Sequence, residues 1–404
     1  MSAITTPFMG TVLRLVRRSV NPFARTSRME ETAGAMNAVA MTAEPLTVNS
    51  IRAIGVEVPM KLPLGTSAAT IRAAPLLLID VETEEGITGR SYLFCYVRAA
   101  APAIASVLSE VLRVVKGDRV APAELWAKLA RRFTLIGVQG VVRMAMSGFD
   151  VACWDALALA AGKALVSILG GVPRPIPAYN SNGLGLMPKE AAADEAEKLL
   201  EGGFTAVKLR LGHPTLAADL DAVRAVRARL PDRVALMADF NQALTVAEAM
   251  RRGRALENEG LYWIEEPVRH DDYRGCSRLA KELDVPVQLG ENFSLPFAMA
   301  EAIRMRASDY VMPDLERIGG VTGWLRAAAL ASAHGLEMSS HLFPEVSAHL
   351  LAVTPTSHWL EYVDWAAPIL AEPLRIVNGQ AAAPDRPGSG VVWNDDAVER
   401  YRIE

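Results

Sequence analysis

The chain has 404 residues, 51% of them hydrophobic, and a formal net charge of −4. This length can bury a large core and suggests two or more domains. Beyond its first 40 residues it has no block of Lys and Arg typical of nucleic-acid binding, and it has no run of about 18 apolar residues that could span a membrane. The three cysteines are too widely spaced for a disulfide framework or a thiolate zinc site, so we expect a reducing, cytoplasmic location.

The first 44 residues differ in composition from the rest. They contain no Lys or Asp and hold five arginines, Arg14, Arg17, Arg18, Arg25 and Arg28. The long apolar segment of a secretory signal is missing, but a targeting segment of another kind is one interpretation. We favour a disordered extension or a start codon assigned too early, because MTAEPLTVNSIRAIGVEVP, from Met41, already has the pattern of a domain's first strand.

Residues 45–170 predict an α+β domain. Two strand-like runs come first, TVNSIRAIGVEV and PLLLIDVETEEGITGRSYLF, with Glu84-Glu85-Gly86 as a hairpin turn. Residues 100–170 are then rich in Ala and Leu at helical spacing, as in AMSGFDVACWDALALAAG. Strands followed by helices are typical of the α+β class.

Residues 171–373 predict a (β/α) barrel. About eight strand-like runs alternate with amphipathic segments: PIPAYNS, TAVKLRL, RVALMADFN, LYWIEEP, VPVQLGEN, DYVMPD, LEMSSH and HWLEYVD. This alternation is typical of a (β/α)₈-type barrel. An open doubly wound sheet is the alternative, but no Gly-rich phosphate turn follows the first strand. Residues 374–404 are turn-rich, and we expect them to pack back on the first domain.

Ionisable residues stand at or near the C-terminal ends of these barrel strands, about one βα unit apart: Lys208, Asp239, Glu265, Glu291, Asp314, His341 and Glu361. Barrel enzymes carry their chemistry at this end of the strands. One such charged residue could simply be solvated in a loop, but this does not readily explain seven of them spaced about one βα unit apart. The pattern therefore predicts an active site at the barrel mouth.

The acids Asp239, Glu265 and Glu291 come from three consecutive strands. Converging carboxylates repel one another unless a cation lies between them, and all-oxygen ligation favours Mg²⁺, with Mn²⁺ as the alternative. The competing interpretation is that Glu265, Glu266 and Glu291 pair with neighbouring Arg or Lys. We favour the metal site.

Asp314 and His341 end adjacent strands. A carboxylate that bonds one imidazole nitrogen would fix the tautomer and make the other nitrogen more basic, so we expect His341 to act as a base. Structural roles are expected for the other histidines, His213, His270, His334, His349 and His358.

Lys208 and Arg210 lie two apart in AVKLRLG, so in a strand both point to one face while Val207, Leu209 and Leu211 point to the other. We expect the two cations to face the metal carboxylates and an anionic substrate. The matching chemistry is proton abstraction next to a substrate carboxylate, which gives an enediolate stabilised by metal and cations.

Several long blocks resemble the enolase superfamily and, within it, the mandelate racemase subgroup: ADFNQ, WIEEPVRHDDY, VPVQLGEN, MPDLERIGGVTGW, MSSHLFPEVSAHLLA and HWLEYVD. The resemblance, from about residue 45 to the C-terminus, implies an N-terminal α+β capping domain, a modified (β/α)₇β barrel and a homo-oligomer, from dimer to octamer. It implies a metal bound by Asp239, Glu265 and Glu291, and a catalytic dyad of Asp314 and His341 in which the histidine is the base. It also implies that Glu361 and Lys208 bind the substrate carboxylate, with Ser181 and Asn241 as polar groups near the substrate.

The chain departs from the subgroup at Arg210, because the racemase pattern is Lys-x-Lys and its second lysine is the base on the opposite face. A guanidinium holds its proton at pH 7, so it is a poor base. The positions that resemble the racemase pocket are mostly apolar: Leu64, Ala68, Ile71, Phe94, Tyr96, Leu135, Leu342 and Val363.

These observations leave three functional readings. The apolar set favours racemisation of an aromatic or alkyl 2-hydroxy acid, which we place first. A one-base dehydratase of acid sugars is the alternative, because it would explain Arg210 as a fixed cation. A catalytically silent binding protein on the same fold is the third reading.

Overall fold

The computed structural model describes residues 45–403, so the predicted extension over residues 1–44 lies outside the described part of the chain. The described residues begin with an antiparallel sheet, in the order β1 (Val48–Gly65), β2 (Thr70–Thr83) and β3 (Thr88–Phe94). Helices α1 (Ala100–Val115), α2 (Pro122–Arg132), α3 (Gly140–Ala160) and α4 (Leu165–Ile168) follow.

Strand β2 is buried on both faces. Its alternating side chains divide between two hydrophobic cores: Leu77 and Ile79 pack with α1 and α3, whereas Leu76 and Leu78 belong to the core that includes the barrel. This explains why the sequence of β2 is continuously apolar from Pro75 to Ile79 and not alternating. The sheet therefore joins the helices of the first domain to the barrel.

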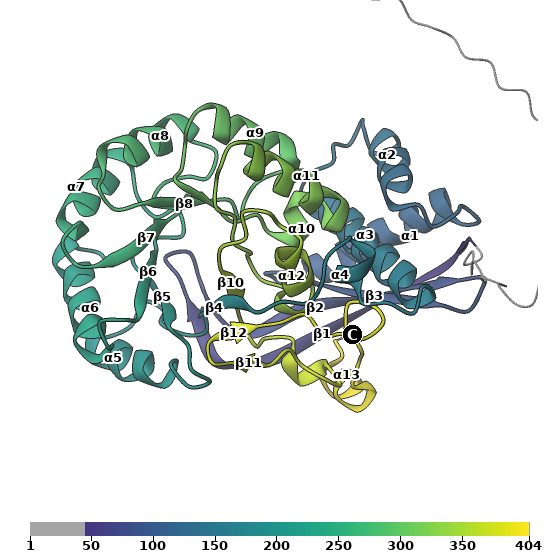
Figure 1. Cartoon of the computed structure of the whole chain (residues 1–404), viewed down its shortest axis with the longest axis horizontal. Coiled ribbons are helices and arrows are strands. Elements are labelled where there is room, and N and C mark those ends of the chain that lie inside the picture. Colours follow the sequence, from purple (N-terminus) through teal and green to yellow (C-terminus); the bar gives the residue numbers. More distant parts are fainter. Residues whose placement is uncertain (1–44, 404) are drawn as a thin grey trace, which may run out of the picture. The chain divides into compact units, whose positions relative to one another are not determined.

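The barrel has seven short parallel strands in its wall. They are β4 (Ile176–Asn180), β5 (Ala206–Arg210), β6 (Ala235–Asp239), β7 (Leu261–Glu265), β8 (Val287–Leu289), β9 (Tyr310–Val311) and β10 (Leu360–Tyr362). Each strand from β4 to β8 pairs with the next, and β10 pairs with β4. Helices cover the outside: α5 (Lys189–Lys198), α6 (Leu216–Arg229), α7 (Val246–Leu256), α8 (Tyr273–Glu282), α9 (Leu295–Arg304), α10 (Leu315–Ile318), α11 (Gly320–Ala333) and α12 (Pro344–Ala352) (Figure 1).

The predicted strand LEMSSH fills the gap between β9 and β10 without forming a regular strand. Ser339 N donates to Val311 O of β9 at 2.9 Å, and Ser340 N donates to Trp359 O at 3.0 Å. Because the bonds alternate between the two neighbours, the segment forms only isolated bridges. It nevertheless closes the wall, and the predicted (β/α)₇β fold with an N-terminal capping domain is confirmed.

The C-terminal segment contacts the first sheet. It contains a short 3₁₀ helix (Ala367–Ile369), the hairpin β11 (Ile376–Val377) and β12 (Gln380–Ala381), and α13 (Asp395–Tyr401). Ile403 N donates to Gly55 O at 3.0 Å, and Trp393 Nε1 donates to Asp80 Oδ1 at 2.7 Å. In the described residues, no helix is long and apolar enough to cross a membrane.

Candidate active site

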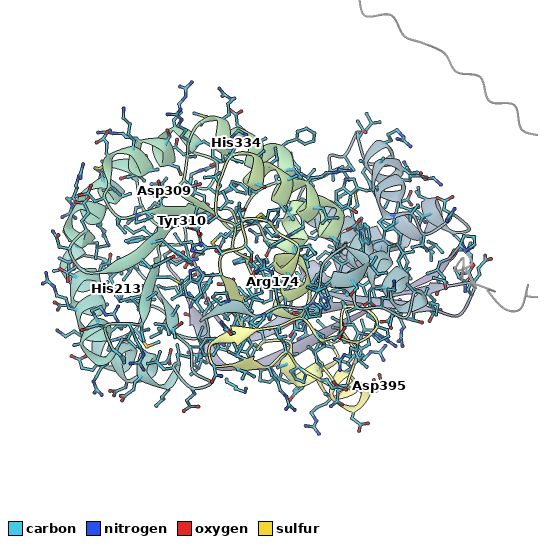
Figure 2. All side chains as sticks on the ribbon, viewed as in Figure 1. Arg174, His213, Asp309, Tyr310, His334 and Asp395 are labelled. Carbon is cyan, nitrogen blue, oxygen red and sulfur yellow. The ribbon has the colours of Figure 1, made fainter. Side chains whose placement is uncertain are left out.

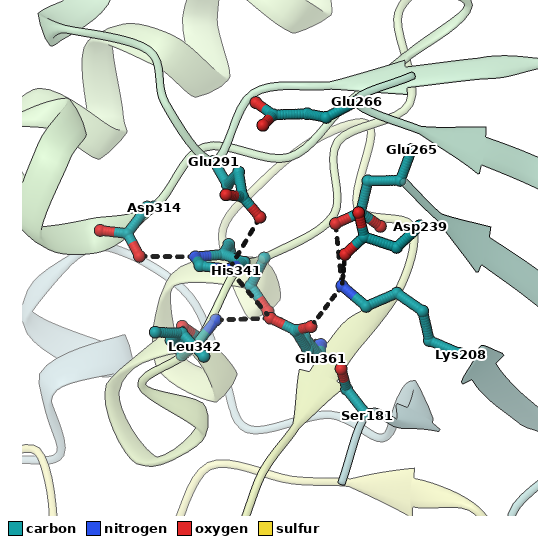
Figure 3. A network of polar contacts seen from close by, with 12 residues as sticks. Ser181, Lys208, Asp239, Glu265, Glu266, Glu291, Asp314, His341, Leu342 and Glu361 are labelled. Carbon is teal, nitrogen blue, oxygen red and sulfur yellow. Dashed lines mark hydrogen bonds and ion pairs between the residues drawn. The ribbon is translucent and has the colours of Figure 1, made fainter. Parts of the chain in front are cut away.

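Three carboxylates gather where β6, β7 and β8 end. Asp239 and Glu265 are the last residues of β6 and β7 and stand opposite each other in the strand register, and Glu291 follows β8. One oxygen from each residue lies within 4.8 Å of the others. Figure 3 shows the three side chains directed toward the same space. Carboxylates this close together suit a hard divalent cation.

The raised pKa values of two of these acids agree with a cation site. Burial raises the pKa of Glu265 to about 8 and also raises the pKa of Asp239, although Lys208 acts against both shifts. Burial would raise the pKa of Glu291 as well, but nearby His341 lowers it to about 2. Crowded, buried carboxylates are disfavoured in their charged forms, and a divalent cation would stabilise those forms. The three residues therefore fit the predicted metal.

Lys208 lies between the acids and is buried. Its Nζ is 2.8 Å from Glu265 Oε1, 2.8 Å from Glu361 Oε1 and 3.4 Å from Asp239 Oδ2. Burial would lower the pKa of Lys208, but these three carboxylates raise it above its usual value. The lysine therefore stays charged, and it can neutralise a substrate carboxylate bound beside the acids.

Glu361 is held on both sides. Its Oε1 contacts Lys208, and its Oε2 accepts a hydrogen bond from Leu342 N at 2.9 Å. Burial would raise the pKa of Glu361, but Lys208 and then His341 hold it below its usual range. The residue thus lies between the lysine and the histidine, as expected of a group near the substrate carboxylate.

Arg210 lines the same cavity as the metal carboxylates, but its guanidinium does not bond them. Its Nη1 donates to Ser181 O and Gly183 O at 2.8 Å each, and its Nη2 donates to Ser181 Oγ at 2.9 Å. No acid among residues 45–403 forms an ion pair with it. The guanidinium is fixed by backbone carbonyls beyond β4 while its side chain still lines the cavity, because the loop after β4 turns back toward β5. Ser181 itself does not line the cavity and is placed behind Arg210.

Asp314 and His341 form the predicted pair. His341 Nδ1 is 2.7 Å from Asp314 Oδ2, and His341 Nε2 is 3.2 Å from Glu291 Oε2. The other oxygen of Asp314 accepts hydrogen bonds from the backbone of Glu316 and Arg317, at 2.8 and 3.1 Å. Asp314 therefore orients the imidazole, and Nε2 points toward the carboxylates (Figure 3).

The surroundings of His341 favour its charged form. Burial would lower the pKa of His341, but Glu291 and Glu361 raise it well above its usual value. A cation bound to Glu291 would weaken the first of these effects, since it would neutralise that carboxylate. The basicity of His341 thus depends on what the neighbouring acids bind.

A cavity of about 320 Å³ opens over these groups. Asn241 reaches it from the loop after β6, where its N and Nδ2 donate to the two oxygens of Asp239 at 2.8 and 3.0 Å. The predicted apolar residues that line the cavity are Leu64, Ala68, Ile71, Phe94, Tyr96 and Leu342. Two larger cavities, of about 520 Å³ each, contain none of the predicted site residues.

Two predicted pocket residues lie elsewhere. Leu135 is fully exposed, in the turn after α2, and it is not part of the cavity wall. The resemblance placed it in the pocket, and the structure does not bring it there, because the turn after α2 directs its side chain to solvent. Val363 lies next to the cavity, in a small apolar space with Phe94 and Leu342.

Sequence reasoning missed several residues of the wall, among them Gln242, Asn292, Arg317 and Trp365. Arg317 stacks on the ring of Tyr96, with 4.6 Å between its Cζ and the ring centroid. Asn292 Nδ2 donates to Glu266 at 2.8 Å and to Glu291 at 3.0 Å. Glu266 thus pairs with an amide and not with a cation. Only its position beside a metal ligand could have marked Asn292 in the sequence.

The other five histidines do not line the cavity. His213 Nδ1 is 2.9 Å from Asp219, and His334 is exposed; both lie outside the network of Figure 3 (Figure 2). His349 Nδ1 accepts a hydrogen bond from Val166 N at 3.1 Å. His270 Nδ1 is 2.9 Å from Gln242 Oε1, and His358 Nε2 is 2.8 Å from Tyr262 Oη. His341 is the histidine that pairs with the acids of the site.

Two family sequence models match the chain. One is described as mandelate racemase / muconate lactonizing enzyme, N-terminal domain, and covers residues 50–170; the other is described as enolase C-terminal domain-like and covers residues 191–397. The chain therefore belongs to the mandelate racemase / muconate lactonizing enzyme group of the enolase superfamily. The resemblance seen in the sequence is confirmed.

Relatives within this family differ in their reactions. A Bradyrhizobium enolase, solved with magnesium and mandelic acid, has 43% identity and a TM-score of 0.86, covering 89% of this chain and 99% of that one. The 3,6-anhydro-α-L-galactonate cycloisomerase of Streptomyces coelicolor is 32% identical over 81% of this chain and 91% of its own length. The L-talarate/galactarate dehydratase of Salmonella typhimurium is 31% identical, over 83% and 87%. Magnesium in the first agrees with the metal predicted for the triad.

Proposed function

We propose that the chain removes the α-proton of a 2-hydroxy carboxylate with His341, and that the reaction continues as the loss of a β-hydroxyl. The observation that carries this proposal is the pair of His341 Nδ1 and Asp314 Oδ2 at 2.7 Å, with Nε2 directed at the carboxylate cluster. A general base requires a fixed tautomer and a second nitrogen turned toward the substrate, and a cation bound to Glu291 would weaken the hold of that carboxylate on Nε2.

The residues around His341 would bind the substrate and stabilise the enediolate. Mg²⁺, held by Asp239, Glu265 and Glu291, would act as a Lewis acid on the substrate carboxylate. Lys208 and Glu361 would bind the same carboxylate, and the charge on Lys208 would stabilise the enediolate left by proton loss. Asn241, which is anchored on Asp239, would contact the substrate from the barrel wall.

Dehydration comes first because Arg210 is fixed as a cation. Its two terminal nitrogens donate to Ser181 and Gly183, and a guanidinium has no lone pair with which to accept a proton as a base. Elimination needs one base only. His341 takes the α-proton, and the carbon–carbon double bond forms as the β-hydroxyl leaves. His341 then gives the same proton to the leaving hydroxyl, which departs as water. The enol then becomes a 2-keto acid.

Racemisation, our first reading of the sequence, becomes the second candidate. The apolar wall of Leu64, Ile71, Phe94 and Leu342 favours it, because a polyol would lack hydrogen-bond partners there. Mandelic acid in the Bradyrhizobium relative points the same way. Racemisation needs a second base, however, and the contacts of Arg210 do not support one.

Product analysis separates these candidates. The protein would be incubated with Mg²⁺ and single stereoisomers of sugar acids, aldaric acids and mandelate. We expect 2-keto-3-deoxy products from acids with a β-hydroxyl and no change in the optical rotation of mandelate. Interconversion of the mandelate enantiomers without any keto product would instead make racemisation the first candidate. No reaction with any of these acids, with Mg²⁺ bound, would favour a non-catalytic binding protein on the same fold.

A further inference from the structure

Glu316 connects the substrate cavity to the catalytic pair. It lies in α10, two residues after Asp314, and is 1% exposed. Its Oε2 accepts a hydrogen bond from Phe94 N at 3.1 Å, at the end of β3. The ring of Phe94 lines the cavity and contacts Tyr96, with 4.5 Å between the ring centroids. One side chain thus reaches from the barrel to the cavity wall of the capping domain.

The backbone around Glu316 holds Asp314. Glu316 N and Arg317 N both donate to Asp314 Oδ1, at 2.8 and 3.1 Å, while Asp314 Oδ2 bonds His341 Nδ1. Arg317 also stacks on Tyr96. Two adjacent residues of α10 therefore touch the wall with their side chains and Asp314 with their amides. A shift of Phe94 and Tyr96 would therefore also move the amides that hold Asp314.

The side chain of Glu316 has the surroundings of a neutral carboxyl group. Burial raises its pKa well above the usual value, and the charge of Asp314 adds to this effect. Its Oε1 is buried and has no hydrogen-bond partner among residues 45–403. A neutral acceptor for Phe94 N can be replaced by a glutamine, which keeps the acceptor and the shape. A methionine keeps the volume but not the acceptor.

We propose that Glu316 is a positioning residue that ties the Phe94 wall to Asp314, so that contact between the substrate substituent and the wall sets the direction of His341 Nε2. This inference rests on the proposed function, because it assumes that His341 moves the α-proton. It makes the capping domain part of the geometry of proton transfer as well as a cover for the cavity.

Three variants test this role. Glu316→Met should lower kcat by roughly 10²-fold, the scale expected for a small misplacement of a catalytic group, with little change in KM. Glu316→Gln should restore most of kcat. The matched control is Glu345→Met, since Glu345 is also buried and also joins β3 to the barrel, through Tyr92 Oη at 2.5 Å, but does not contact Asp314. This control should keep the wild-type kcat.

A second readout does not require turnover. With ¹⁵N-labelled histidine, the Nδ1 proton of His341 should shift or broaden in Glu316→Met and in Glu316→Ala, and should stay unchanged in Glu316→Gln and Glu345→Met. An unchanged signal in the first two variants would overturn the inference. So would equal losses of kcat in Glu316→Met and Glu345→Met, or in Glu316→Met and Glu316→Gln. A wild-type protein inactive on every acid would instead count against the proposed function.

Discussion

Lys208 and Arg210 lie two residues apart on β5, yet their surroundings differ. Lys208 contacts three carboxylates within 3.4 Å, whereas Arg210 donates to the carbonyls of Ser181 and Gly183 and to a hydroxyl. The first cation compensates the charge of the acid cluster. The second adds a fixed positive charge to the cavity wall. This difference favours one-base chemistry over racemisation.

Arg210→Lys should change the stereochemistry of proton exchange. An amine can release a proton where a guanidinium cannot, so we expect α-hydrogen exchange of the second enantiomer of mandelate to appear in D₂O, while dehydration slows. Arg210→Met, which offers neither charge nor base, is the control and should show no such exchange. If the wild type already exchanges both enantiomers at similar rates, Arg210 does not limit the reaction to one face.

The ionic residues were the most predictable part of the site. Asp239, Glu265, His341 and Glu361 could be placed from the sequence because each ends a short apolar run, and strand ends meet at one edge of a barrel. The contacts of Glu316 could not be predicted in this way. They depend on how α10 packs against β3, more than 200 residues away in sequence, as the separation of 222 between Glu316 and Phe94 shows.

At the scale of elements, the backbone after β8 determines where Glu291 stands. Gly290 has a φ of +143°, and a Cβ there would lie 2.7 Å from Met312 N. This close approach brings β8 against the end of β9, next to the triad. A side chain at position 290 would push the two strands apart.

Gly290→Ala should therefore weaken Mg²⁺ binding, by roughly tenfold or more if Glu291 is a ligand, because supporting contacts of a metal site contribute on that scale. Calorimetric titration with Mg²⁺ measures this directly. Gly260→Ala is the control, since Gly260 has a φ of +71° and nothing lies within 4 Å of its Cβ position. Equal Mg²⁺ affinity in Gly290→Ala and the wild type would contradict this account of Glu291.

The sequence predicted the barrel strands better than the loops between them. All eight segments of the wall were found, because their apolar runs recur at βα spacing, although Met338–His341 forms bridges and not a regular strand. Leu135 was misplaced because a resemblance in sequence does not fix the local path of a turn. The exposure of such a residue depends on the local path of the chain, which composition does not predict.

At the scale of the whole molecule, buried polar contacts join the capping helices to the barrel. Asp150, on α3, accepts hydrogen bonds from Thr322 N at 2.9 Å and Thr322 Oγ1 at 2.5 Å, on α11. Burial raises the pKa of Asp150 to about 7. Between about pH 4 and pH 7, Asp150 therefore keeps its proton in the folded protein. In the unfolded chain, where its pKa is about 3.9, it has released that proton.

This linkage predicts a pH dependence of stability. The contribution of Asp150 is complete below about pH 4 and is lost as the pH rises through 7, since the unfolded state then binds fewer protons than the folded state. We expect the free energy of unfolding in urea to fall between about pH 4 and pH 7, and Asp150→Asn to reduce that fall. Asp395→Asn, at an exposed position (Figure 2), is the control. A fall of the same size in Asp150→Asn would contradict the assignment.

In the proposed reaction, His341 removes the α-proton with Mg²⁺ present. α-Hydrogen exchange of mandelate in D₂O, followed by NMR, tests this step most directly, because mandelate has no β-hydroxyl to lose and so separates proton abstraction from elimination. We expect exchange of one enantiomer with retained configuration. We also expect a loss of about 10²–10⁴-fold in His341→Asn, with Mg²⁺ still bound. Undiminished exchange in His341→Asn would contradict this role of His341.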